Sequence, residues 1–201
     1  MMKPFFAKGK TLARNLTQAA SAGSQLLPID TPSDFAVGDR IFCAESGAGL
    51  EYLGVVLQVN TASLEVSLPL KITKTVAATL WRPSYAFQWS RVLESSSHTT
   101  YQNGMVVERA VGGALWPVRT ADPTHQQTLS FHALPLSSFN VFRAWLDTAV
   151  RSGLDEFTWV SENGEVARVR LLDADFKEVD TCVKSINLSL PLAVLQEGGY
   201  A

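Results

Sequence analysis

The sequence predicts a mainly β protein, a β-rich α+β chain with one long helix. Most of its 201 residues fall into short runs in which apolar and polar residues alternate, with turn-forming residues between them. One stretch, residues 137–152, has apolar residues at the spacing of an amphipathic helix instead. Because 46% of the residues are hydrophobic and only 18% are charged, the chain has the composition of a folded protein.

Residues 1–83 are predicted to form a small β-barrel or sandwich with a basic segment at its N-terminus. Short strands with turn signals between them are typical of both folds. The expected strands are 11–18, 35–43 (which begins as a turn), 52–59, 64–70 and 76–81. A proline cannot continue a central strand, so Arg82-Pro83 marks the expected boundary with a second unit.

The second unit, residues 84–201, is predicted to be β-rich and to carry the helix. Its expected strands are 86–93, 105–111, 127–134 and 179–192. Ser137 or Ser138 can accept hydrogen bonds from the free N–H groups of the first helical turn. Gly153 can adopt the left-handed conformation that ends a helix. We therefore expect an amphipathic helix that covers one face of a sheet.

A β-hairpin is expected directly after the helix. The runs 157–161 and 165–172 alternate between apolar and polar residues, and they flank Asn163-Gly164. Asn-Gly is the preferred dipeptide of a two-residue hairpin turn. No reaction chemistry is visible in the helix or the hairpin, so this part of the chain is expected to be architectural.

Charge and cysteine content exclude several classes of protein. A net charge of −2 gives the chain no overall attraction to nucleic acid or to anionic membranes. No apolar run approaches the roughly twenty residues that cross a bilayer, so no membrane insertion is expected. The two cysteines, Cys43 and Cys182, are too few for a disulfide framework or a zinc site, and both are expected to be buried thiols.

No motif in the chain indicates an enzyme, a metal site or a cofactor site. The histidines lack metal-ligand spacing, and no serine stands in a Gly-x-Ser-x-Gly turn. Three aspartates close in sequence lack the glycine and terminal glutamate of a calcium loop, which makes them solvated turn residues. The residues concerned are His98, His125, His132, Asp173, Asp175 and Asp180.

Two groups of residues leave alternatives open. Trp81, Tyr85 and Trp89 lie close together near the expected boundary, where aromatic side chains either pack between domains or present flat faces to a sugar. Arg168 and Arg170 share one face of their expected strand, where they meet either carboxylates of a neighbouring subunit or water.

The second unit resembles minor tail proteins of long-tailed bacteriophages, of the distal tail or upper baseplate type. The resemblance lies in the order of short motifs over about residues 86–192, and no single motif is diagnostic. In chain order they are Tyr101-Gln102-Asn103-Gly104, Glu108-Arg109, Leu129-Ser130-Phe131, the helix, Gly153 followed by Phe157-Thr158-Trp159, Asn163-Gly164 and Val169-Arg170.

The resemblance implies a tail-tube-like β-sandwich domain in a protein that is not an enzyme. It implies a ring-forming subunit, a homo-hexamer, that connects the tail tube protein to the tail-tip hub protein. Such a protein is made in the host cytoplasm and resides in the virion tail. The interface residues that we assign on this basis are Trp159, Arg168 and Arg170.

Two further functions compete with this one. A carbohydrate-binding module of a tail or cell-surface protein would use Trp81, Tyr85 and Trp89, which must then be exposed in one plane. A hydrolase would need a cleft that brings together distant residues such as His132 and Asp173, and their spacing in sequence gives no support for it.

Overall fold

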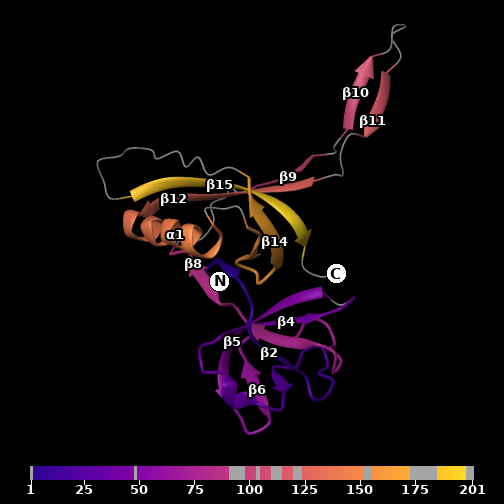
Figure 1. Ribbon diagram of the computed structural model, residues 1–201, viewed down its shortest axis with the longest axis vertical. Helices are drawn as coiled ribbons and strands as arrows, with labels where there is room; N and C mark the ends of the chain where they lie inside the picture. The colour runs from indigo at the N-terminus through magenta and orange to yellow at the C-terminus, as the bar shows by residue number, and fades with distance from the viewer. Residues whose placement is uncertain are drawn as a thin grey trace.

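The computed structural model describes residues 2–47, 49–90, 98–102, 105–109, 115–119, 124–151, 155–172 and 185–197. The fold is mainly β, with 51% of the chain in strands and, in the described part, one α-helix. Its two large sheets are antiparallel, and one of them curves into a half-barrel. The predicted fold class is confirmed at this level. Figure 1 shows one large sheet above the other, with the helix beside the upper one.

The first large sheet has six strands and is built from the N-terminal part of the chain. In spatial order the strands are β2 (Thr11–Asn15), β7 (Thr79–Arg82), β4 (Arg40–Glu45), β5 (Gly49–Val59), β6 (Ser63–Val66) and β3 (Leu26–Pro28). A short 3₁₀ helix, Pro32–Asp34, precedes β4. The long strand β5 pairs first with β4 and then with β6. Gly54, with φ +81°, lies at the register shift of the β4–β5 pairing, where an added Cβ would collide with the Ser67 hydroxyl.

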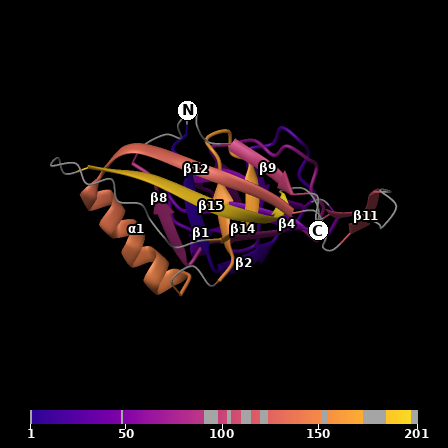
Figure 2. The ribbon, with the colours of Figure 1, turned by 90° about the horizontal axis from the view of Figure 1, so that it is seen from above.

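The second large sheet has seven strands from both ends of the chain. In spatial order they are β8 (Tyr85–Gln88), β1 (Phe5–Lys8), β13 (Phe157–Val160), β14 (Val166–Leu171), β15 (Ser185–Glu197), β12 (Thr124–Pro135) and β9 (His98–Gln102). Figure 2, seen from above, shows β15 and β12 running side by side over β14. The helix α1 (Leu136–Ala149) packs against this sheet.

Strand β1 differs from the predicted division of the chain at residue 83. It lies between β8 and β13, so the first residues of the chain belong to the seven-stranded sheet and not to the N-terminal unit. Phe6 is fully buried in the core under α1, whereas Phe5 is buried on the opposite face. No strand was predicted here, because the four residues of β1 show no alternation of apolar and polar side chains.

The predicted helix is confirmed, but its predicted caps are not. The helix begins at Leu136 with Pro135 at the N-cap position and no capping side chain. The prediction for Ser137 and Ser138 is wrong, because both already lie inside the first turn. At the other end, Arg151 takes the left-handed conformation with φ +47°. Gly153, for which this role was predicted, lies outside the described residues.

The predicted hairpin is confirmed, with a different turn. Strands β13 and β14 pair antiparallel, and the Ser161 N–H donates to the Glu165 carbonyl at 2.9 Å. The Gly164 N–H donates to the Ser161 carbonyl at 3.0 Å, which leaves a three-residue loop. The prediction of a two-residue turn is wrong. The type I′ turn expected for Asn-Gly requires positive φ at both central residues, and of Asn163 and Gly164 only Gly164 has it.

Among the described residues, three groups of buried side chains hold the molecule together. One is formed by residues of the six-stranded sheet and of the segments that connect its strands. Another lies between α1 and the seven-stranded sheet. The third lies between the two sheets and consists of Phe5, Ala7, Phe42, Tyr52, Trp81, Val160 and Val166. In this third group the rings of Phe42 and Trp81 stack with centroids 4.5 Å apart, and the Arg40 guanidinium lies 4.9 Å from the Phe5 ring centre. Apolar contact therefore continues from one sheet into the other.

Strands β10 (Met105–Arg109) and β11 (Leu115–Arg119) form a separate two-stranded sheet. They pair only with each other among the described strands, and Figure 1 shows them apart from the seven-stranded sheet. The sequence predicted a strand at 105–111, but it did not indicate that this part of the chain forms its own sheet.

Phe6→Ala tests whether β1 is an integral strand of the C-terminal core. The Phe6 ring contacts Trp89, Phe157 and Trp159 with centroids within 5.5 Å. Because Phe6 is fully buried, we expect its truncation to lower the free energy of unfolding by about 3–5 kcal/mol in urea denaturation. Tyr85→Ala, at a half-exposed aromatic, is the control, with an expected loss below about 1 kcal/mol. Equal midpoints for Phe6→Ala and the wild type would contradict this placement.

Candidate functional site

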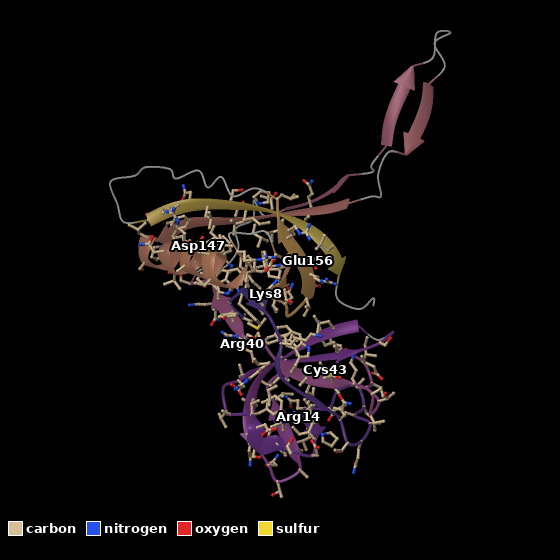
Figure 3. All side chains as sticks on the ribbon, in the orientation of Figure 1. Lys8, Arg14, Arg40, Cys43, Asp147 and Glu156 are labelled. Carbon is tan, nitrogen blue, oxygen red and sulfur yellow. The ribbon has the colours of Figure 1, made fainter. Side chains whose placement is uncertain are left out.

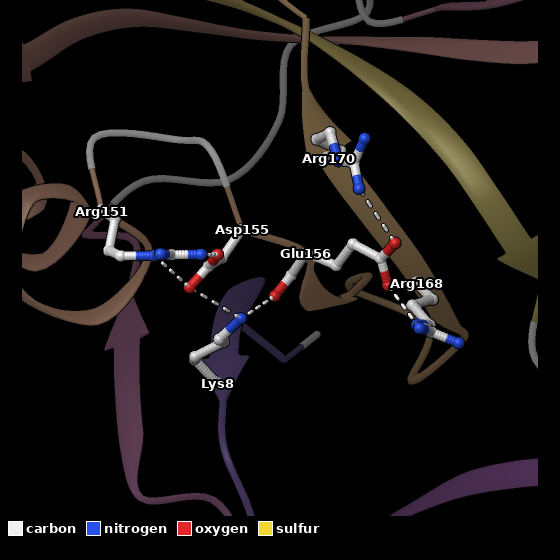
Figure 4. Close-up of polar contacts among 6 residues, drawn as sticks. All are labelled: Lys8, Arg151, Asp155, Glu156, Arg168 and Arg170. Carbon is white, nitrogen blue, oxygen red and sulfur yellow. Dashed lines mark hydrogen bonds and ion pairs between the residues drawn. The ribbon is translucent and has the colours of Figure 1, made fainter.

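A cluster of charged side chains lies where β1, β13 and β14 meet the end of the helix, and we call it the charged cluster. It contains four cations and two carboxylates, a net charge of +2. Figure 3 places Lys8 and Glu156 on the upper, seven-stranded part of the molecule. The members are Lys8, Arg151, Asp155, Glu156, Arg168 and Arg170, and Figure 4 shows their contacts.

Glu156 is the centre of the cluster, because its one carboxylate holds both arginines of β14. Its Oε1 accepts from Arg170 Nη2 at 3.1 Å, and its Oε2 accepts from Arg168 Nη2. Both arginine side chains remain at least half exposed. Arg168 and Arg170 lie on one face of β14, as predicted. Within the described part of the chain, both pair with Glu156. Whether they also meet a neighbouring subunit stays a prediction.

The other half of the charged cluster joins β1 to the segment before β13. Lys8 Nζ donates to the Glu156 carbonyl at 2.5 Å and lies 3.6 Å from an Asp155 carboxylate oxygen. Arg151 donates to the same carboxylate, four residues along the chain. The hydrogen bond from Arg151, with a smaller contribution from Lys8, lowers the pKa of Asp155 against the opposing effect of burial. Asp155 is therefore an ion-pair partner and not a proton donor at neutral pH.

Trp159 does not belong to this surface, so its assignment as an interface residue is wrong. Its side chain is only 1% exposed and lies in the core under α1, 5.2 Å from the Phe6 ring. The strand register gives the reason. Trp159 pairs with Ala167, whereas Thr158 pairs with Arg168. Residues next to each other on a strand point to opposite faces, so Trp159 and Arg168 are on different sides of the sheet.

The three aromatic candidates do not form an exposed plane. Trp81 is buried in the contact between the two sheets, as the interdomain-packing alternative predicted. Trp89 is fully buried and stacks on Phe131 with centroids 4.0 Å apart. Tyr85 alone is half exposed. A flat sugar-binding surface of these three residues is therefore absent.

A buried polar group in the six-stranded sheet was not predicted. Glu51 and Lys74 are both buried, with Lys74 Nζ 3.4 Å from Glu51 Oε1. Glu51 Oε2 also accepts the Lys71 N–H at 3.1 Å. Cys43, directly opposite Glu51 in the sheet, is a buried free thiol as predicted. Glu51 thus holds the segment around residues 71–74 against β5. A lysine buried by the tertiary fold has no local signal in sequence.

Burial raises the pKa of the Cys43 thiol from its ordinary value of 9.0 to about 12, with Lys74 opposing the shift. The thiolate is the reactive form of cysteine, and this site disfavours it. Cys43 is therefore a packing residue and not a nucleophile. The second cysteine, Cys182, lies outside the described residues.

The side chains of His98, His125 and His132, and residues Asp173, Asp175 and Asp180, lie outside what the structure describes. Within the described ranges, no group of three or more His, Cys, Asp or Glu side chains could hold a metal ion. In the same ranges, no helix has the length and apolar character needed to cross a membrane.

The fold and the site define a mainly β protein of two packed sheets with a charged, partly exposed cluster on the seven-stranded sheet. Comparison with known proteins finds no family that the chain matches and no curated protein of significantly similar sequence.

We expect Cys43 to resist alkylation in the folded protein. In the Cys182→Ser variant, iodoacetamide at pH 8 should label Cys43 only after unfolding, because the folded thiol stays protonated. Mass spectrometry measures the labelling. Rapid labelling under native conditions would show that the thiol is accessible.

The raised pKa of Cys43 also makes stability depend on pH. Its contribution to the stability of the fold is complete below pH 9 and should decline between pH 9 and 12, because the thiol of the unfolded chain ionises first.

Lys74→Met should destabilise the protein more than the loss of a surface charge. It leaves the Glu51 carboxylate buried beside an apolar side chain, which costs about 3–5 kcal/mol. The double variant Glu51→Gln/Lys74→Met should recover most of the loss, since the glutamine oxygen can still accept the Lys71 N–H. Urea denaturation measures both variants. If the double variant is no more stable than Lys74→Met alone, the loss comes from packing and not from the unpaired charge.

Proposed function

We propose that this protein is a structural component of a bacteriophage tail tip, a ring-forming distal tail or baseplate protein that connects the tail tube to the tail-tip hub. The motif order of residues 86–192 supports this proposal. So does a β-sheet covered on one face by a single long helix, the arrangement expected of a tail-tube-like domain. Its partners are further copies of itself in a ring, a tail tube protein and a hub protein.

The observation that carries the proposal is the position of the two edge strands. Strands β8 and β9 end the seven-stranded sheet on opposite sides, and neither pairs with another described strand on its outer side. An edge strand presents unpaired N–H and C=O groups, which another chain can pair with. When β8 of one copy pairs with β9 of the next, the contact is head-to-tail, and such contacts close into a ring when the rotation permits.

The separate β10–β11 sheet supports an assembly function as well. A two-stranded hairpin is marginally stable by itself in water. In sequence its ten strand residues include only three charged ones, Glu108, Arg109 and Arg119. A neighbouring subunit that packs on this hairpin would stabilise it. The predicted interface hairpin, β13–β14, is instead in the middle of its sheet, so the assembly contact is assigned to the edges and to β10–β11.

The test is the assembly state of the purified protein and of an edge variant. We expect closed rings by negative-stain electron microscopy and the corresponding mass by light scattering. Tyr85→Lys/Ala86→Lys places two charges on the exposed side chains of β8 and should shift the sample to single chains, since lysine on an edge opposes pairing. Val37→Lys, at an exposed apolar residue in the turn before β4, is the matched control and should still form rings.

Hydrogen exchange locates the contact independently. In rings the amides of β8 and β9 should exchange more slowly than in the edge variant, because new interstrand hydrogen bonds protect them. A particle of one chain at every concentration, with fast exchange in both strands, would contradict the proposal. Rings that the edge variant leaves intact would place the contact elsewhere.

A further inference from the structure

The charged cluster has features of a docking surface that the ring proposal does not use. Arg168 and Arg170 each contact Glu156 through a single nitrogen, Nη2. A guanidinium carries five N–H donors, so most donors of both arginines have no partner among the described residues. The two side chains are nevertheless positioned, because Glu156 fixes both of them and its own backbone carbonyl accepts from Lys8. Such preorganisation reduces the entropy lost on binding.

Two leucines flank the arginines on the same part of the sheet. Leu172 follows Arg170 at the strand period of two and continues the ladder, with its N–H donating to Pro191. Leu195 lies in β15 at the register shift opposite Arg168 and Val169, without a direct partner in β14. Both leucines are nearly half exposed, at 47% and 45%. A surface of arginines beside apolar side chains is typical of protein interfaces and not of a purely solvated charged face.

We propose that this surface binds an extended acidic segment of a partner protein, with carboxylates at alternate positions and apolar residues outside them. The cluster has a net charge of +2, and arginine forks match carboxylates with two parallel hydrogen bonds. Alternate residues of an extended chain repeat at about 6.6–6.8 Å, the same spacing as Arg168 and Arg170 on β14. The proposal stands on the described surface alone and does not require ring assembly.

A protein segment is favoured over nucleic acid by the same observations. Binding to nucleic acid is carried by many phosphate contacts and a broad positive surface. Here two carboxylates are built into the cluster, and the whole chain has a net charge of −2. The exposed leucines have no use against a phosphate backbone. They are suited to the apolar side chains that flank the acidic ones in the proposed segment.

The experiment uses the full chain and a fluorescent heptapeptide, L-T-D-T-D-T-L, in anisotropy titrations at low salt. Arg168→Gln/Arg170→Gln should weaken binding by roughly ten- to hundredfold, from the loss of hydrogen bonds to charged groups. Arg143→Gln, at an exposed arginine on α1, is the matched control and should bind as the wild type does. The L-T-N-T-N-T-L peptide should bind as weakly as the double arginine variant binds the acidic one.

Two more variants separate charge from geometry. Arg168→Lys/Arg170→Lys keeps the charge and removes the forks, so peptide affinity should fall. Glu156→Gln raises the positive charge of the cluster but removes the carboxylate that positions both arginines, so peptide affinity should fall several-fold. The proposal is overturned if the wild type does not bind the acidic peptide, if the double glutamine variant binds it equally well, or if an oligonucleotide of equal charge binds more tightly than the peptide. None of these results bears on the edge contact, which the ring measurements test separately.

Discussion

The insertion of β1 between β8 and β13 is the contact on which the rest of the structure depends. These two strands come from residues far apart in sequence, and β1 joins them into one sheet by pairing with both. Its two faces serve two different groups of buried residues, Phe6 under the helix and Phe5 in the contact between the sheets. One four-residue strand therefore contributes to the C-terminal core and to the junction with the six-stranded sheet.

The charged cluster depends on the same strand. Lys8 is the last residue of β1, and its hydrogen bond to the Glu156 carbonyl fixes the chain just before β13. That position brings the Glu156 carboxylate to Arg168 and Arg170. Without β1 the segment at residues 155–156 would lose its cationic neighbour on that side. The preorganisation of the two arginines is thus a consequence of how the N-terminus is paired.

The sequence predicted the helix and the β13–β14 hairpin because both have long periodic patterns. It missed β1, whose short apolar run has no period, and it missed Glu156, whose contact with Lys8 spans 148 residues. It also grouped Trp159 with Arg168 as surface residues, although their register places them on opposite faces of the sheet. In each failure the deciding information is which strands pair and in which register, and a single sequence does not contain that information locally.

The two proposed contacts occupy different parts of one sheet, and this separation has a mechanical consequence. The edge strands β8 and β9 are at the two ends of the strand order, whereas β14, which carries the arginines, is in its middle. Pairing at the edges acts through backbone groups in the plane of the sheet, while Arg168 and Arg170 point out of that plane. Copies can therefore join edge to edge and still present the charged cluster on every subunit. A ring of this kind would offer one acidic-segment site per copy, so that several weak contacts act together on a partner with matching symmetry.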